Sequence, residues 1–215
     1  MPDKQHIFYD ILDKKRLGLL PLFDHFKDRF CLAGGTALAL RLGHRDSIDF
    51  DFFTWQDFDA EELLREIKGV FAGHSIEIIQ AGNKTLNLII DDEVKASFFC
   101  IKEKLLFPTL ELEFLKLASL QDIACMKIVA LLRAQLKDYV DLFYLFKNMS
   151  LEEIFNNCHK KYERFDEVVY LKALVSFDDI EQAEILFEKR KLVTLEQIKA
   201  DFQRRVNEYV RKLKA

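Results

Sequence analysis

Two aspartates separated by one residue, Asp49 and Asp51, are the strongest chemical signal in the sequence. If this stretch forms a β-strand, successive side chains point to opposite faces, so the carboxylates share one face while Phe50 and Phe52 point into a core. Neighbouring carboxylates repel each other unless a cation lies between them, and their oxygens are the hard ligands that Mg²⁺ and Mn²⁺ prefer. The pair therefore predicts a divalent metal site, with two solvated carboxylates on an exposed strand as the alternative.

A glycine pair, Gly34–Gly35, precedes the aspartates and is followed by Thr36. It lies between a short apolar run and a helical run, so its backbone N–H groups occupy a strand-to-helix turn, where phosphate binds readily. Arg45 lies between the glycines and the aspartates and has the geometry to pair with phosphate. The alternatives are a plain tight turn for the glycines and, for Arg45, a surface ion pair with Asp46 or another carboxylate. Combined with the metal signal, the glycine pair favours phosphoryl or nucleotidyl transfer.

A second group of charged residues lies in the apolar helical stretch from Lys127 to Asp141. Lys127 has apolar neighbours, a position from which a lysine reaches into a cleft to meet phosphate as a point charge. Asp138 and Asp141 share one helix face as i and i+3 neighbours, and Lys137 lies beside them. An ordinary surface lysine, a helix N-cap and a solvated helix face are the alternative interpretations.

The order and spacing of these motifs over residues 31–147 resemble one known family. Its members are the AbiEii/AbiGii nucleotidyltransferase toxins of abortive infection. The stretches that carry the resemblance are GGTALAL, GHRDSIDFDFF and MKIVALLRAQLKDYVDLFYL, with LVSFDDIEQAE later in the chain. The resemblance implies an α+β fold: a DNA polymerase β-like nucleotidyltransferase core, made of a small mixed sheet with helices, and a C-terminal helical domain.

The same resemblance implies roles for individual residues. Asp49 and Asp51 would hold Mg²⁺ (or Mn²⁺), Lys127 would neutralise phosphate charge, and Asp138 would be the base for an incoming hydroxyl. Asp141 would orient its neighbours. The implied catalytic residues are Asp49, Asp51, Lys127 and Asp138. The expected nucleotide-binding residues are Gly34, Gly35, Thr36, Arg45, Lys127 and Lys137.

The implied activity is transfer of a nucleotide from an NTP to an acceptor hydroxyl, with tRNA or another RNA as acceptor. The resemblance further implies the toxin of a bacterial, type IV-like toxin–antitoxin system, with an antitoxin protein as partner. Polymerase β-like enzymes usually take a third carboxylate from a later strand, where this chain has Ala96 or Ser97. The missing acid leaves a second hypothesis, a non-catalytic nucleotide-binding or partner-binding protein on the same fold.

The elements that must position these residues follow from hydrophobic periodicity. We expect strands at 30–33, 48–53, 76–79, 85–90 and 94–101. We expect helices within 5–29, with a second helix beginning at Pro21, and at 36–42, 59–71, 123–136, 138–147, 151–162, 166–174, 178–189 and 194–213. Beyond Pro108 the chain has neither glycine nor proline. We therefore expect a nucleotidyltransferase-like α+β domain over 1–107 and a helical domain over 108–215.

Composition narrows the class of protein further. A net charge of −4 argues against binding nucleic acid through overall charge and leaves room for a local basic patch. Arg204 and Arg205, near the end of the chain, either contact an RNA backbone or form a solvated face. The 4 cysteines form no CxxC pair, so core thiols are expected rather than disulfides or zinc ligands. Neither a signal peptide nor a membrane span is recognisable, which predicts a cytoplasmic protein without a membrane partner.

Overall fold

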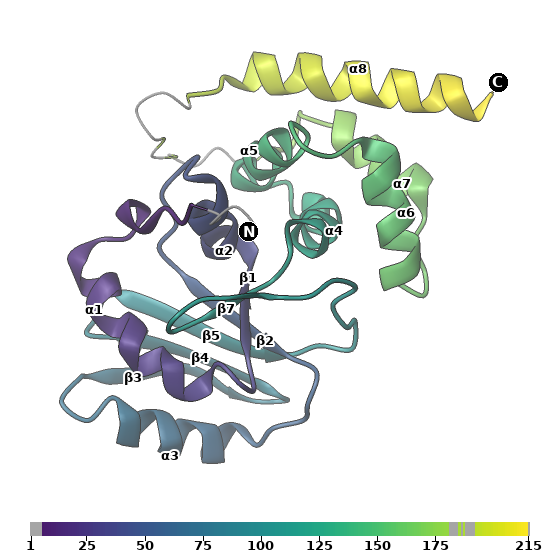
Figure 1. The fold of residues 1–215 in the computed structure, drawn as a ribbon. Helices are drawn as coiled ribbons and strands as arrows, with labels where there is room; N and C mark the ends of the chain where they lie inside the picture. The colour runs from purple at the N-terminus through teal and green to yellow at the C-terminus, as the bar shows by residue number, and fades with distance from the viewer. Residues whose placement is uncertain (1–5, 181–184, 186, 188–191, 215) are drawn as a thin grey trace, which may run out of the picture. The chain divides into compact units, whose positions relative to one another are not determined.

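The computed structural model describes residues 6–180, 185, 187 and 192–214, which form two compact units (Figure 1). The first unit takes its residues from 1–104 and 108–119, and the second from 105–107 and 120–215. This division differs from the predicted boundary at 107/108. The reason is that residues 108–119 contain two short strands that join the sheet of the first unit.

The described residues of the first unit form a seven-stranded sheet with the order β3-β4-β5-β2-β1-β7-β6. Strand β2 pairs antiparallel with β1 and parallel with β5, so it lies inside the sheet. Strands β6 and β7 were not predicted, because two-residue strands are too short to show an alternating pattern. The strands are β1 (Cys31–Ala33), β2 (Phe50–Thr54), β3 (Ile76–Gly82), β4 (Thr85–Ile90), β5 (Val94–Cys100), β6 (Leu110–Glu111) and β7 (Lys116–Leu117).

Helices cover one face of this sheet. The ring of Phe23, at the end of α1, contacts the rings of Phe50 and Phe52 on β2 and of Phe71 after α3. Asp59 caps α3 by accepting hydrogen bonds from the backbone amides of Glu61 and Glu62. The helices of this unit are η1 (Tyr9–Ile11), α1 (Lys14–Phe23), η2 (Asp24–Phe26), α2 (Gly34–Leu42) and α3 (Ala60–Val70).

The prediction that Pro21 begins a second helix is wrong. Pro21 lies inside α1, which ends two residues later at Phe23. A proline so close to the helix end removes one hydrogen bond without preventing the last turn from forming.

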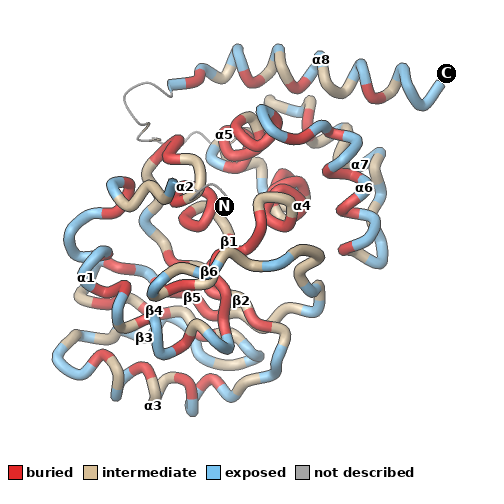
Figure 2. Tube along the Cα trace, viewed as in Figure 1, coloured by how far each residue is buried: buried red, intermediate tan, exposed pale blue. Residues whose placement is uncertain are grey.

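The two faces of the central strand differ in burial, as the alternating sequence predicted. Phe50, Phe52 and Thr54 are buried, whereas Asp51 and Phe53 between them are half-buried. Figure 2 shows buried positions in the strands and on the inner sides of the helices. The polar face of β2 is therefore the face on which chemistry can take place.

The second unit is helical. Helix α4 packs against α5 and α6, and α8 packs against α5, α6 and α7. The chain turns between α4 and α5 at Ala134, which has a left-handed φ of 51°. Thr194 and Gln197 form a capping box at the start of α8. The helices are α4 (Leu120–Ala130), η3 (Leu131–Arg133), α5 (Leu136–Leu145), α6 (Leu151–Lys161), α7 (Glu167–Val175) and α8 (Leu195–Leu213).

Two further expectations concern the helical region. The helix expected at 178–189 lies largely outside the described residues, as does the end of the stretch LVSFDDIEQAE. None of the helices in the described part of the chain is long and apolar enough to cross a membrane.

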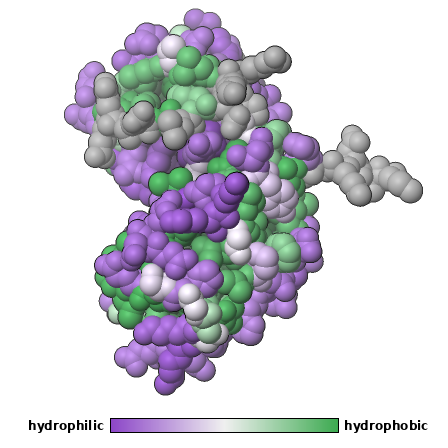
Figure 3. Space-filling model, turned by 90° about the vertical axis from the view of Figure 1, so that its left-hand side faces the viewer, coloured by the Kyte–Doolittle hydropathy of each residue, from purple (hydrophilic) through white to green (hydrophobic). Residues whose placement is uncertain are grey.

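The surface is mixed in character. Figure 3 shows hydrophobic patches between hydrophilic residues on the face that it presents. Among the exposed large apolar side chains, Ile48 immediately precedes the aspartate pair, and Ile78 and Ile79 lie on the edge strand β3.

Candidate active site

The aspartate pair lies at the start of the central strand. Asp51 belongs to β2 and is paired with Ala33 on β1 and with Ser97 on β5. Asp49 precedes the first residue of β2, and both aspartates are half-buried. Asp51 therefore lies on the side of β2 opposite Phe50 and Phe52.

The first glycine of the pair touches this carboxylate directly. Gly34 begins α2 with a left-handed φ of 67°, a conformation that residues with a side chain rarely adopt. A Cβ atom at this position would lie 3.0 Å from Oδ2 of Asp51. Glycine is thus required for two reasons, backbone conformation and close approach. The structure places the glycine turn and the aspartate in one site.

The second glycine lies against a guanidinium. A Cβ atom at Gly35 would lie 2.6 Å from Nη2 of Arg45 and 3.0 Å from Oγ of Ser47. Arg45 is buried, and its Nη1 donates to the carbonyl of Asp46 at 2.8 Å. The N-cap residue of α2 provides no side-chain cap. A cation and the positive end of a helix therefore meet at this turn, as an anion site requires.

Thr36 has a different position from the two glycines. Its hydroxyl is buried, donates to the backbone carbonyl of Asp49 and lies 2.9 Å from Oγ of Ser47. A hydroxyl has one proton, so while Thr36 donates to the carbonyl of Asp49 it accepts a hydrogen bond from the hydroxyl of Ser47. Thr36 thus fixes the segment that carries the first aspartate.

The position of the expected third carboxylate is occupied by Ser97. It is buried beside Asp51 on β5 and is paired on its other side with Asn87 of β4. Among the described residues, no group of three or more His, Cys, Asp or Glu side chains could hold a metal ion. Two carboxylates on one face nevertheless fit Mg²⁺, which proteins often hold with one or two carboxylates while substrate phosphates and water complete the shell.

In the second unit, Lys127 forms a buried group of ion pairs. Its Nζ lies 2.7 Å from Oδ1 of Asp138 and 2.6 Å from Oδ2 of Asp141, and both acids have 0 % exposed surface. The other oxygen of Asp138 accepts a hydrogen bond of 2.9 Å from Nη2 of Arg133. Lys137, in contrast, is exposed. The structure thus groups three of the four charged residues predicted in this stretch and separates Lys137 from them.

This group holds the helices of its unit together. Lys127 lies on α4, the two acids lie on α5, and Arg133 lies in the turn between the helices. Each oxygen of Asp138 already accepts a bond from a cation, and the amine of Lys127 is bound between two carboxylates. The arrangement fits a structural role, since a buried lysine is stable only when paired.

Two basic residues of α8 are also paired. Arg204 donates to Asp201 and to Glu208, and Nε of Arg205 lies 2.7 Å from the carboxylate of Asp201. Acids on the same helix thus balance the charges of these two arginines.

A family model described as the nucleotidyl transferase AbiEii toxin of a type IV toxin–antitoxin system matches residues 22–215. The chain belongs to this family. A relative from Aquifex aeolicus, the uncharacterized protein aq_aa25, is 36% identical over 188 residues, which cover 84% of this chain and 88% of the relative. The recognition made from the sequence motifs is confirmed, and the AbiEii protein described here is a nucleotidyltransferase by family.

Solved structures confirm the fold. JHP933 from Helicobacter pylori matches with a TM-score of 0.59 and 18% identity, covering 96% of this chain and 94% of JHP933. The antibiotic-resistance factor ANT(2'')-Ia matches with a TM-score of 0.54 and 14% identity, covering 69% of this chain and 92% of the factor. The α+β nucleotidyltransferase fold with a C-terminal helical part is thus shared with these proteins.

Two residues around the aspartates were not singled out by the sequence analysis. Ser47 contacts both Thr36 and the turn at Gly35, and Arg16 on α1 donates from Nε to the carbonyl of Ile48 at 2.8 Å. The sequence holds one signal for Arg16, because it lies three and four positions before Leu19 and Leu20, on the helix face that is buried. The type of residue at such a position indicates a buried contact but does not identify the partner.

Proposed function

We propose that this AbiEii protein transfers a nucleotide from an NTP to a hydroxyl of an RNA acceptor such as tRNA, with Mg²⁺ or Mn²⁺. The observation that carries the proposal is the direct approach of Gly34 to the carboxylate of Asp51, with Arg45 against Gly35. The turn supplies donors for phosphate, and the aspartates supply ligands for a metal ion. The proposed phosphate-binding turn and the proposed metal ligands are thus neighbours within the first unit.

In the first unit, different residues would bind the metal ion and the phosphates. Asp49 and Asp51 would hold the ion, and the amides at Gly34 and Gly35 together with Arg45 would bind the phosphates. When bound, Mg²⁺ supplies positive charge that stabilises the transferring phosphoryl group and the leaving pyrophosphate. The chain itself contributes position, since its charges and donors are fixed before the substrate arrives.

For the second unit we propose that some charged residues stabilise the helix packing and that others contact phosphate. Lys127, Asp138 and Asp141 are buried and paired with one another, so we assign them to holding α4 and α5 together. Lys137 is exposed on α5, and Arg133 is anchored by Asp138 with its side chain 58% exposed. The side chains of these two residues are exposed to solvent, and we propose them as candidates for contacts with phosphate.

The test is a labelling experiment. The protein is incubated with each labelled NTP, Mg²⁺ or Mn²⁺, and total RNA, beside the variants Asp51→Asn and Asp28→Asn. Asp28 is an exposed aspartate that pairs with Lys116 and is the matched control. We expect labelled RNA with the wild type and the control and at least a hundredfold less with Asp51→Asn, as for loss of a charge-stabilising group in a transferase. Labelling by Asp51→Asn at the wild-type rate, or none by wild type under any condition, refutes the proposal.

The family description supports a toxin of a type IV toxin–antitoxin system. We extend the proposal to a cognate antitoxin as protein partner. Induced expression of the chain in a bacterial host should slow growth, and the Asp51→Asn variant should not. Equal toxicity of the two proteins would separate the toxic effect from nucleotide transfer.

The serine beside Asp51 favours a second candidate function. Ser97 leaves the site with two carboxylates, which is enough to hold an NTP with its metal ion. A protein that binds an NTP without transferring it would show a dissociation constant in equilibrium dialysis and no release of pyrophosphate. Pyrophosphate release that is lost in Asp49→Ala excludes this candidate.

A further inference from the structure

The two aspartates are held in place by different means. Asp51 is fixed by sheet pairing on both sides, to Ala33 and to Ser97. Asp49 precedes the first residue of β2, so the sheet does not fix it. The backbone at this point depends on side chains, because its carbonyl groups need partners outside the strand ladder.

Two side chains supply these partners. The hydroxyl of Thr36 donates to the carbonyl of Asp49, and Nε of Arg16 donates to the carbonyl of Ile48 at 2.8 Å. The carbonyl group of Asp49 is thereby held from α2, and the carbonyl group of Ile48, the residue before it, is held from α1. These two bonds restrict the backbone that carries the Asp49 side chain.

Arg16 is itself firmly placed. It is 4% exposed although it lies on a helix whose neighbouring residues Lys15 and Leu17 are exposed. Its Nη1 bonds the carboxylate of Asp13 and lies 3.7 Å from Oε1 of Glu93, and its Nη2 donates to the backbone carbonyl of Glu93 at 3.4 Å. Burial of a guanidinium is costly unless its donors are used, and here each nitrogen has a partner.

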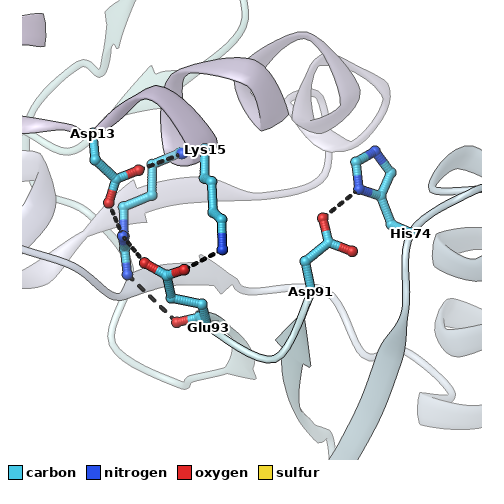
Figure 4. Close-up of polar contacts among 6 residues, drawn as sticks. Asp13, Lys15, His74, Asp91 and Glu93 are labelled. Carbon is cyan, nitrogen blue, oxygen red and sulfur yellow. Dashed lines mark hydrogen bonds and ion pairs between the residues drawn. The ribbon is translucent and has the colours of Figure 1, made fainter.

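The partners of Arg16 connect three parts of the first unit. Asp13 is the N-cap of α1 and also accepts from the amide of Arg16. Glu93 precedes β5, the strand that runs parallel to β2, and also pairs with Lys15. Figure 4 shows Asp13, Lys15 and Glu93 gathered at this point. The guanidinium thus spans the starts of β2 and β5 at the level of Asp49.

A neighbouring pair makes no contribution to this contact. His74 and Asp91 bond each other at 2.7 Å, and Figure 4 shows them pointing toward one another beside the Arg16 group. They hold the turn before β5 to the segment after α3.

We propose that Arg16 is a positioning residue for metal binding, acting through the Ile48 carbonyl to fix the carboxylate of Asp49 beside that of Asp51. The inference rests on the proposed function in so far as the aspartates hold a metal ion. Arg16 precedes residue 22, where the match to the family model begins.

The test uses three variants of the full chain. Arg16→Met removes every donor, Arg16→Lys keeps the charge with a different geometry, and Lys15→Met removes the adjacent exposed cation that shares Glu93 but does not reach Ile48. The first measurement is backbone hydrogen exchange of peptides spanning 46–53, with the α3 peptide 60–70 as an internal reference. The second is the Mg²⁺ concentration that gives half-maximal nucleotide transfer.

We expect Arg16→Met to speed exchange in 46–53 by about tenfold or more, the effect of losing a charged hydrogen bond, while exchange in 60–70 is unchanged. The Mg²⁺ requirement should rise by about tenfold, with Arg16→Lys intermediate and Lys15→Met like the wild type. Unchanged exchange in 46–53, or equal acceleration in 60–70, overturns the proposal, because the arginine would then be irrelevant or only a general stabiliser.

The two measurements separate this inference from the proposed function. If the wild type transfers no nucleotide, the proposed function fails, while the exchange measurement still decides whether Arg16 fixes the Asp49 segment. If the wild type is active and local exchange in Arg16→Met equals that of the wild type, the positioning role alone is overturned. If Arg16→Met does not fold, Arg16→Lys is compared with Lys15→Met in the same way.

Discussion

Replacing Lys127 by methionine should destabilise the helical unit strongly. The amine is the shared partner of Asp138 and Asp141, at 2.7 and 2.6 Å, and both acids have 0 % exposed surface. Methionine fills a similar volume but removes the amine from both buried carboxylates. Removing one partner of a buried ion pair costs about 3–5 kcal/mol.

The structure indicates where this cost arises. Arg133 still bonds Asp138 at 2.9 Å in the variant, so Asp138 keeps one cation while Asp141 loses the amine of Lys127. The expected loss is a large fraction of the ~5–15 kcal/mol that stabilises a typical domain. We therefore expect the Lys127→Met variant to be partly unfolded at 37 °C.

The assay is urea denaturation followed by circular dichroism at a helix-sensitive wavelength. The single tryptophan, Trp55, lies in the first unit, so its fluorescence reports that unit independently. The matched control is Lys137→Met, which removes an exposed lysine nearby and should change stability by less than about 0.5 kcal/mol.

A compensated variant sharpens the test. Replacing Asp138 and Asp141 by asparagine in the Lys127→Met background removes the buried charges with little change in shape, and most of the lost stability should return. Suppose instead that the free energy of unfolding of Lys127→Met lies within about 1 kcal/mol of the wild-type value and that the variant loses affinity for NTP. The lysine is then a ligand for phosphate. That result would refute the structural role assigned to it.

Three further predictions concern single positions. Gly34→Ala should cost about 1–2 kcal/mol in stability and strongly reduce nucleotide transfer, because φ is 67° and the new Cβ would lie 3.0 Å from Oδ2 of Asp51. Ser97→Asp should lower the melting temperature without metal and raise it with Mg²⁺, since a third carboxylate beside Asp51 repels it until a cation binds. Tyr209→Phe should cost about 1 kcal/mol below pH 10 and less above it. Burial and the hydrogen bond to Glu167 raise the pKa of Tyr209 to about 12 in the folded protein. The hydroxyl therefore stabilises the fold fully at pH values below the pKa of tyrosine in the unfolded chain, and this stabilisation is lost as the pH rises through the pKa in the folded protein.

The controls for these predictions come from the same chain. Gly18→Ala, at a helical glycine with nothing within 4 Å of the new Cβ, should be neutral or stabilising by about 0.5–1 kcal/mol. Full activity of Gly34→Ala would contradict the close-approach argument. A melting temperature of Ser97→Asp that does not respond to Mg²⁺ would contradict a metal site at Asp51. A constant difference between Tyr209→Phe and wild type from pH 8 to pH 12 in urea titrations would contradict the raised pKa.

Local patterns in the sequence predicted the elements of the site. The alternation around Asp49 and Asp51 gave the central strand and its two faces, because side chains on a strand alternate regardless of the neighbouring strands. The glycine at 34 signalled a special turn, since few other residues adopt its backbone conformation. The order of the motifs also identified the AbiEii family, which the family match confirms.

The partners of these residues were decided by tertiary structure. The sequence showed Lys127 as a candidate for phosphate, and only the fold places it between Asp138 and Asp141. In the same way, only the fold brings Arg16 to the carbonyl of Ile48, 32 positions away in the chain.

The physical reason is the range of the interactions. Periodicity and turn preference depend on a few neighbouring residues, so the sequence by itself determines where strands and helices form and which of their faces are apolar. Strand order, the attachment of residues 108–119 to the first sheet, and the choice of ion-pair partners depend on contacts between distant segments. The sequence therefore determined which groups are able to do chemistry, and the tertiary structure decided which of them face a substrate and which hold the fold together.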